Sequence, residues 1–132
     1  MKANVSWREG MAFEGHTESG HKIVLDGSNP GTGPSPMEMV LLSAATCSAI
    51  DVVSILEKAR QTFKNVEVEV DAERAETVPK VFTKIHLKFI VSGKGLKENH
   101  VKRAVELSAE KYCSASIMME KAGVVVSHSY EM

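Results

Sequence analysis

The feature that most constrains the fold is the stretch of residues 35–60, which contains no glycine and no proline after Pro36. Ser35 can cap a helix, Pro36 suits the first helical position because it has no amide hydrogen to lose, and Glu38 completes a capping box. Apolar side chains then cover nearly the whole circumference, which is typical of a buried central helix. These side chains are Met37, Met39, Val40, Leu41, Leu42, Ala44, Ala45, Ile50, Val52, Val53, Ile55 and Leu56. Such a helix needs cover on every side, and the few strands of one short chain are too few to provide it, so we expect an obligate homodimer.

One narrow strip of the predicted helix is polar. At about 100° per residue, its members fall within roughly 40° of a single line. They are Ser43, Cys47, Asp51, Ser54 and Lys58. A cysteine in such a strip indicates either a reactive site built on a core helix or an inert buried cysteine beside a solvated seam, because free cysteine is among the most buried residue types. The pattern alone leaves both interpretations open.

Length and composition bound the class of protein. A chain of 132 residues predicts a single domain, residues 1–132, with 43% hydrophobic and 25% charged residues as in ordinary globular proteins. A net charge of −1 gives no reason to expect nucleic acid or an anionic membrane as a partner. Residues 1–10 do not resemble a secretory signal, and uninterrupted apolar runs such as residues 39–42 are too short to span a bilayer. We therefore expect a cytoplasmic protein without a membrane partner.

The two cysteines, Cys47 and Cys113, lie 66 positions apart. This spacing excludes a CxxC redox motif and a compact zinc knuckle. A standing structural disulfide is not expected in the cytoplasm. No histidine lies at ligand spacing to either cysteine, so we expect no metal and no cofactor.

The N-terminal part predicts three short strands. Residues 3–7, 11–16 and 21–26 alternate or carry apolar residues on one face, and glycine-containing turns separate them, so they form an antiparallel meander. Residues 27–34 are rich in glycine and proline and end the meander. They lack the lysine and spacing of a phosphate-binding loop, so we interpret them as a connector that reaches the helix cap.

The C-terminal part predicts two strands, a helical segment and a last strand. Residues 66–73 are acidic on one face and residues 81–91 are basic on one face, which suits an antiparallel pair. His86 falls on this polar face and is predicted to be a surface residue of the sheet. Residues 96–121 are helical with a break expected at Cys113, and residues 124–130 form the final strand. The order is βββ-α-ββ-α-β, an α+β class.

Three segments carry a resemblance to a known family. Residues 35–39, 47–53 and 104–114 resemble the OsmC/Ohr family, and the match follows the element order over essentially the whole chain. The resemblance implies an OsmC-like fold of antiparallel sheets wrapped around long central helices, in an intertwined homodimer with two sites at the interface. It also implies thiol-dependent reduction of organic hydroperoxides in stress defence. Cys47 would be the attacking, peroxidatic cysteine and Cys113 the resolving one.

The implied chemistry needs an external dithiol reductant, because a disulfide between the two cysteines must be reduced after each turnover. An apolar pocket would favour organic hydroperoxides over hydrogen peroxide. Its candidate walls are Met37, Met39, Phe82, Tyr112, Met118 and Met119, although for each residue taken singly the pattern favours ordinary core packing.

Three further residues are candidates for supporting Cys47. Reductases of this family carry a glutamate ten residues before the attacking cysteine, whereas here Met37 holds that position and Glu38 lies nine before. Those reductases also use an arginine from the N-terminal strands, and Arg8 is the only arginine before residue 35. Asp51, one turn from Cys47, would raise the thiol pKa unless a cation such as Lys58 neutralised it. Glu38 lies about 180° around an ideal helix from Cys47, so we expect it to be mainly a capping residue.

The sequence is compatible with two functions. One is a thiol peroxidase that acts on organic hydroperoxides. The other is a non-enzymatic protein of the same fold that binds an apolar ligand in a dimer-interface cavity, or senses redox state through its cysteines. A sequence with both cysteines but altered activating residues is compatible with either function.

Overall fold

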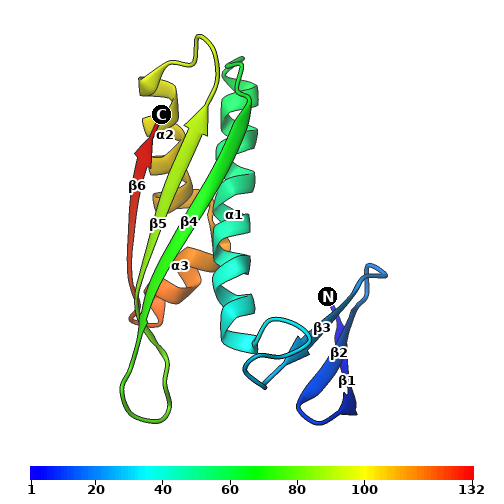
Figure 1. Cartoon of the computed structure of the whole chain (residues 1–132). Helices are drawn as coiled ribbons and strands as arrows, with labels where there is room; N and C mark the ends of the chain where they lie inside the picture. The colour runs from blue at the N-terminus through cyan, green and yellow to red at the C-terminus, as the bar shows by residue number, and fades with distance from the viewer. The chain divides into compact units, whose positions relative to one another are not determined.

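The computed structural model describes all of residues 1–132, which form an α+β fold (Figure 1). The chain divides into two compact units, residues 1–42 and residues 43–132. The boundary falls inside the long helix α1, Pro36–Lys58. The single domain expected from the length stays a prediction, and each unit is described below by itself.

The first unit is a three-stranded antiparallel sheet followed by a loop and the first turns of α1. Strands β1 (Ala3–Glu9), β2 (Ala12–Thr17) and β3 (Lys22–Asp26) pair in the order β1-β2-β3, as the sequence predicts. A bulge interrupts the register of β1 between Trp7 and Glu9. Gly10 closes the β1–β2 turn at a φ of 55°, where glycine is favoured.

The loop after β3 is organised by Asp26, which is buried. Its carboxylate accepts hydrogen bonds from the backbone N–H of Ser28 at 2.8 Å, and from both the N–H and the hydroxyl of Thr32 at 3.0 Å. These donors lower the pKa of Asp26 from 3.8 to about 2, the Thr32 N–H having the largest effect. A Cβ at Gly33 would collide with the carbonyl oxygen of Val24, so this close approach requires glycine. The loop connects β3 to the helix cap, as expected.

Helix α1 begins with the predicted capping box. The Ser35 N–H donates to Glu38 Oε1 at 2.9 Å, and the Glu38 N–H donates to Ser35 Oγ at 3.2 Å. The helix ends at Lys58, two residues before the predicted end, and Arg60 then takes a left-handed φ of 56°. The local sequence therefore determines the start of the helix.

Within the single chain α1 is buried on one face only, as expected for a helix that one chain is too small to cover. Its buried positions form one face, made of Ala44, Ala45, Ser48, Val52 and Leu56. Leu42 and Ile50, which lie off this face, are 54% and 62% exposed. The helix is also long and apolar enough, at 23 residues, to cross a membrane by length and composition, which the short uninterrupted apolar runs did not indicate. The core helix of a soluble protein satisfies the same criteria, so this is weak evidence.

The second unit has a three-stranded sheet with helices on one face (Figure 1). Strand β4 (Asn65–Arg74) pairs antiparallel with β5 (Phe82–Ser92), as predicted. Strand β6 (Val125–Glu131) pairs parallel with β5, so the prediction of antiparallel sheets is wrong at this one pair. The reason is the connection, because helices α2 (Glu98–Leu107) and α3 (Ser114–Lys121) return the chain before β6 begins.

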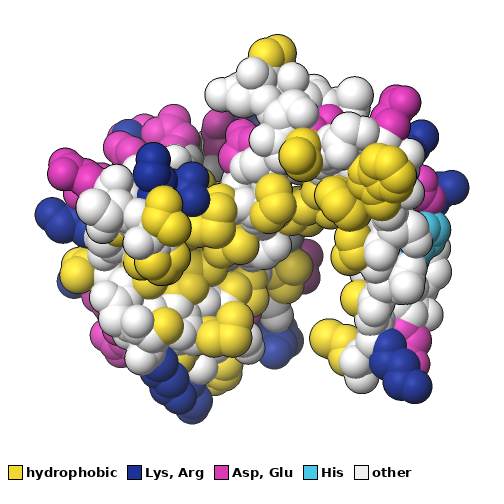
Figure 2. Space-filling model, turned by 90° about the horizontal axis from the view of Figure 1, so that it is seen from below, with side chains coloured by type: hydrophobic (Ala, Val, Ile, Leu, Met, Phe, Trp, Pro, Cys, Tyr) yellow, Lys and Arg dark blue, Asp and Glu magenta, His cyan; other side chains and the backbone are white.

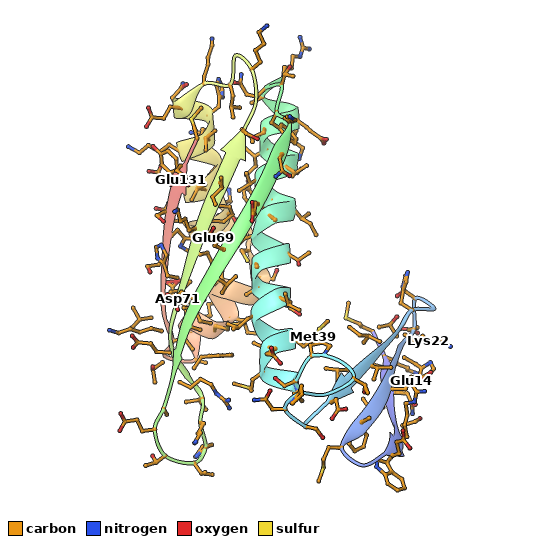
Figure 3. The ribbon with its side chains drawn as sticks, viewed as in Figure 1. Glu14, Lys22, Met39, Glu69, Asp71 and Glu131 are labelled. Atoms are coloured by element: carbon orange, nitrogen blue, oxygen red, sulfur yellow. The ribbon has the colours of Figure 1, made fainter.

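The two faces of this sheet differ as the alternation predicts. The face toward the helices buries Phe82, Ile85, Leu87, Phe89 and Val91 of β5. On the other face, Glu69 of β4 lies opposite Lys88, whose Nζ is 3.2 Å from the carboxylate of Glu131 on β6 (Figure 3). Complementary charges thus run across all three strands.

His86 lies on this outer face, opposite Asp71. Its ring nitrogens contact the hydroxyls of Ser127 and Ser129 at 2.6 and 2.8 Å. The predicted surface position is confirmed, although the ring is half-buried between its partners.

Candidate functional site

The two cysteines sit on different helices of the second unit. Cys47 lies in the middle of α1, and Cys113 is the N-cap residue of α3, with an extended backbone at φ −75° and ψ 96°. A short π-helical turn, Ser108–Tyr112, precedes Cys113 and produces the predicted break. The Cys113 N–H donates to the Ser108 carbonyl at 2.9 Å, the five-residue spacing of a π-turn. This turn ends the helical run and places a thiol at the start of the next helix.

Both cysteines are free thiols, and they lie close enough for the Cys113 side chain to raise the pKa of Cys47. Cys113 is fully buried, whereas Cys47 is partly exposed. The structure therefore brings together the pair on which the sequence hypothesis depends. The attacking and resolving roles stay predictions.

Cys113 is surrounded by hydrogen-bond partners. The Ser48 hydroxyl donates to Cys113 Sγ at 3.1 Å, and the Ser116 N–H donates to the same sulfur at 3.4 Å. The thiol itself faces the carbonyl oxygen of Ala44 at 3.9 Å. Ser48 and Ser116 are both buried, so no water competes for these contacts. Such donors stabilise negative charge on a sulfur.

Cys47 has a less favourable environment for a thiolate. Burial is the largest cause of its raised pKa, and the Cys113 side chain and the negative charge of Asp51 raise the pKa further. The N–H of Ala115, in the first turn of α3, acts in the opposite direction because it donates a hydrogen bond to the Cys47 sulfur. The balance keeps Cys47 protonated in the single chain.

Asp51 is held by a hydroxyl and not by a cation. The Ser108 hydroxyl donates to Asp51 Oδ2 at 3.0 Å, and no ion pair involves Asp51. Lys58 lies exposed in the last turn of α1, nearly two turns beyond Asp51, and does not neutralise it, so Asp51 raises the pKa of Cys47, the outcome expected in the absence of a neutralising cation.

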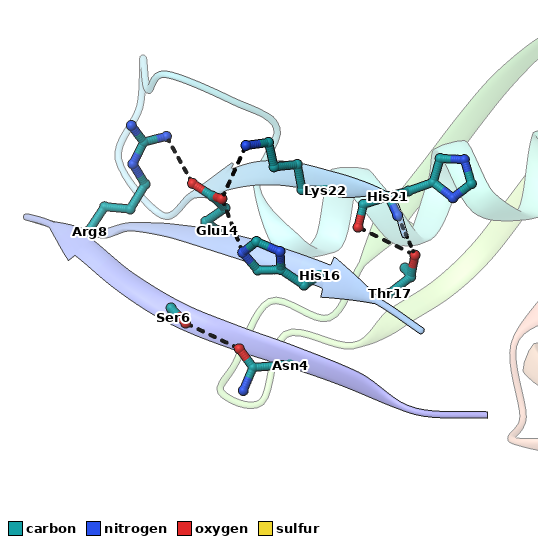
Figure 4. Close-up of polar contacts among 8 residues, drawn as sticks. All are labelled: Asn4, Ser6, Arg8, Glu14, His16, Thr17, His21 and Lys22. Atoms are coloured by element: carbon teal, nitrogen blue, oxygen red, sulfur yellow. Dashed lines mark hydrogen bonds and ion pairs between the residues drawn. The ribbon is translucent and has the colours of Figure 1, made fainter. Parts of the chain in front are cut away.

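Glu38 and Arg8, the other two support candidates, have local partners in the first unit. The hydrogen bond from the Ser35 N–H, followed by that from the Ser35 hydroxyl, lowers the pKa of Glu38. Arg8 pairs with Glu14 at 3.6 Å (Figure 4). Glu14 also accepts from His16 at 3.0 Å and lies 3.9 Å from Lys22. Both residues belong to the first unit, residues 1–42, which contains no cysteine.

The candidate pocket walls do not form a common cavity in the second unit. Phe82 is buried in the sheet, Met119 is half-buried, and Tyr112 and Met118 are exposed. Grooves of about 170, 500 and 340 Å³ are present, and their lining includes neither these residues nor either cysteine. Met37 and Met39 lie in the first unit, at the start of α1. No group of three or more histidine, cysteine or acidic side chains could hold a metal ion.

Sequence reasoning missed the serines that surround the cysteines. Ser48 lies about 100° around the helix from Cys47, outside the polar strip. The available signal was a serine among the small and apolar residues of the buried face of α1. Nothing in the sequence indicates that its partner is Cys113, because the two residues are 65 positions apart.

The sequence model of the family described as OsmC-like protein matches residues 27–129. The chain belongs to the OsmC-like family. It is 55% identical over 132 residues to the protein YhfA of Escherichia coli strain K12, with 100% of this chain and 98% of the relative covered. The chain is also similar to the solved structure of a hypothetical protein from Aquifex aeolicus VF5, with 32% identity and a TM-score of 0.88 over 98% of this chain and 93% of that chain.

More distant members of the OsmC-like family share the fold. The organic hydroperoxide resistance protein OsmC of Legionella pneumophila is 18% identical, with a TM-score of 0.73 over 99% of this chain and 96% of that chain. The α+β OsmC-like fold predicted from the sequence is thereby confirmed. Membership of the OsmC/Ohr family indicates a role in redox chemistry or stress defence, and proteins of this family are generally homodimers.

Proposed function

We propose that this protein is a thiol peroxidase that reduces organic hydroperoxides. The observation that carries the proposal is the proximity of the Cys47 and Cys113 side chains, which come from α1 and from the start of α3. The Legionella relative, described as an organic hydroperoxide resistance protein, supports this class of substrate.

The proposed reaction has three balanced steps. The Cys47 thiolate attacks the terminal peroxide oxygen, the O–O bond breaks, and the leaving alkoxide takes a proton to become an alcohol, so that Cys47 is oxidised to a sulfenic acid. The Cys113 sulfur then attacks the Cys47 sulfur, which releases water and forms a disulfide. An external dithiol reduces this disulfide to two thiols and is itself oxidised to a disulfide.

Activation of Cys47 requires a positive charge that its own unit does not supply. Burial and Asp51 raise the pKa of Cys47, whereas a peroxidatic thiol needs a lowered pKa. We therefore propose that residues 1–132 act as one OsmC-like domain in a cytoplasmic homodimer, and that this assembly completes the site. Arg8 is the candidate cation and Glu38 the candidate carboxylate, because the family motif places such groups in these regions. Exposed apolar side chains gather in patches on the face shown in Figure 2, as a homodimer interface and an apolar substrate pocket would require.

A second candidate function is supported by the same electrostatics. A thiol with a raised pKa, beside a carboxylate that no cation neutralises, reacts slowly with peroxide. This favours a non-enzymatic protein that binds an apolar ligand, or that senses redox state through slow formation of the disulfide.

The experiment compares Cys47→Ser and Cys113→Ser with the wild type, using cumene hydroperoxide or hydrogen peroxide and dithiothreitol as the reductant. We expect Cys47→Ser to abolish peroxide consumption. Cys113→Ser should allow one turnover and leave a sulfenic acid on Cys47 that dimedone traps. Equal loss in both variants without a trapped sulfenic acid would contradict the peroxidase and favour the second candidate. Hydrogen peroxide should be the poorer substrate, because it has no apolar tail to bury.

A further inference from the structure

The two sulfurs that would form the disulfide have unequal surroundings. Cys113 Sγ receives two hydrogen bonds, from the Ser48 hydroxyl at 3.1 Å and from the Ser116 N–H at 3.4 Å. Cys113 is completely buried, whereas Cys47 is partly exposed. An incoming reductant can therefore reach Cys47 more easily, and a negative charge that forms on Cys113 has two hydrogen-bond donors beside it.

This asymmetry matters for thiol–disulfide exchange. A thiolate attacks one sulfur of a disulfide, and the other sulfur leaves with the electron pair of the broken S–S bond. The rate rises with access to the attacked sulfur and with the stability of the leaving thiolate. The access to Cys47 and the two hydrogen bonds that Cys113 receives favour attack on Cys47 and departure of Cys113.

The position of Ser48 also calls for an explanation. Within a helix, a serine hydroxyl commonly bonds the carbonyl one turn back. Here the hydroxyl donates to a sulfur of another element, at a fully buried position of α1. The neighbouring Ser54, on the same helix, is only half-buried and has no such partner.

We propose that Ser48 is a positioning residue for the reductive step, whose hydroxyl stabilises Cys113 as the leaving thiolate and so directs the external dithiol to Cys47. The inference rests on the disulfide of the proposed function. In the balanced step, a reductant thiolate forms a bond to Cys47, the Cys47–Cys113 bond breaks, and Cys113 leaves as a thiolate. The second thiol of the reductant then loses its proton and attacks the reductant sulfur bonded to Cys47. This closes an oxidised cyclic disulfide and releases Cys47, and the two protons of the dithiol pass to the two cysteines.

The test starts from protein oxidised with diamide, so that it does not depend on hydroperoxide activity. Three variants are compared: Ser48→Ala removes the hydroxyl, Ser48→Thr keeps it, and Ser54→Ala removes a hydroxyl elsewhere on α1. The measurements are the rate of reduction by dithiothreitol, the reduction potential in dithiothreitol buffers, and the cysteine that carries the adduct after a pulse of glutathione.

Loss of one hydrogen bond to a charged group corresponds to about a tenfold change, so Ser48→Ala should be reduced about tenfold more slowly than the wild type. Its reduction potential should become more negative by about 30 mV, the equivalent of tenfold for two electrons. Ser54→Ala should behave as the wild type, Ser48→Thr should restore most of the rate, and the wild-type adduct should be on Cys47.

Two results would overturn the inference. One is an unchanged rate and potential in Ser48→Ala, which would leave Ser48 as a merely buried hydroxyl whose loss affects only the melting temperature. The other is a glutathione adduct on Cys113 in the wild type. If diamide forms the disulfide but hydroperoxide does not, the peroxidase proposal fails while the role of Ser48 is still measured. If diamide forms no disulfide, both proposals fail.

Discussion

The sheet of the first unit and the sheet of the second unit have the same number of strands but opposite degrees of cover. In the second unit, alternate residues of β5 are buried, with Leu87, Phe89 and Val91 fully inaccessible. In the first unit every residue of β1 is exposed, including Val5 at 63% and Trp7 at 67%. The difference arises because α1, α2 and α3 cover one face of the second sheet.

The first sheet lacks the packing cover that the second sheet has. An apolar hollow of about 450 Å³ in the first unit is lined by side chains that include Val5, Met11 and Phe13. Exposed apolar patches of this kind mark interaction surfaces. Because proteins of this family are generally homodimers, a second copy of the chain is the partner that we expect to cover the first sheet.

We expect the largest effect when the stability cost of an alanine substitution is compared between the two sheets. Leu87→Ala should lower the free energy of unfolding by about 3 kcal/mol, because it leaves a cavity at a fully buried position. Ile23→Ala in the first sheet, where the side chain is 39% exposed, should cost about 1 kcal/mol or less when urea unfolding is measured on the monomer. Equal costs would show that the first sheet has a core of its own.

The next effect concerns the dimer. Trp7→Ala should raise the dimer dissociation constant by about thirtyfold, since buried tryptophans are frequent interface hot spots worth about 2 kcal/mol. Asn4→Ala, on the same strand, serves as the control and should change the constant little. Sedimentation equilibrium measures both. A wild-type protein that remains a monomer at micromolar concentration would contradict the expected homodimer.

A smaller effect is expected at the start of α1. Glu38→Ala should lower the free energy of unfolding by about 1 kcal/mol and the melting temperature by about 3 °C, because the capping box is lost. Glu38→Gln should keep both, since an amide can accept the same hydrogen bond from the Ser35 N–H. A Glu38→Gln variant with full stability but more than tenfold lower peroxidase activity would instead identify Glu38 as a catalytic acid.

The smallest expected effects concern the pH at which each unit loses stability. The pKa of Asp26 is about 2 in the folded state and 3.8 in its ordinary state. Its contribution to the free energy of unfolding is therefore fully present above pH 3.8 and is lost as the pH falls from 3.8 through 2. Burial is the main cause that lowers the pKa of His128 in β6. The charge of Glu120 raises this pKa, and His86 lowers it further. The unfolded chain therefore takes up this proton first, and stability falls once the pH drops below about 6.5.

Hydrogen exchange resolved by residue checks this order, because the second unit should weaken at a higher pH than the Asp26 loop. His128→Phe should remove the first step and keep the stacking on Phe89, whose ring centroid lies 6.2 Å away. Asp26→Asn should remove the second step. Simultaneous loss of protection in both units would mean that they unfold together.

Local patterns in the sequence were sufficient for most of the secondary structure. The capping box, the alternation of β4 and β5 and the break at Cys113 each depend on residues within a few positions of one another. Backbone preferences and side-chain periodicity act over this range, so the elements could be predicted. The identity of the cysteine pair came from the family resemblance together with this element order.

Contacts between distant residues were decided by the tertiary structure. The parallel pairing of β6, the Ser48–Cys113 bond and the Ser108–Asp51 bond join residues from different elements. Such contacts depend on how helices pack on the sheet and on which face each side chain occupies, and a change of one residue in register alters both. The sequence by itself therefore identified the two cysteines. Only the packing of α1 against α3 decided that Cys113 receives the hydrogen bonds of Ser48 and Ser116 while Cys47 lies near the charge of Asp51.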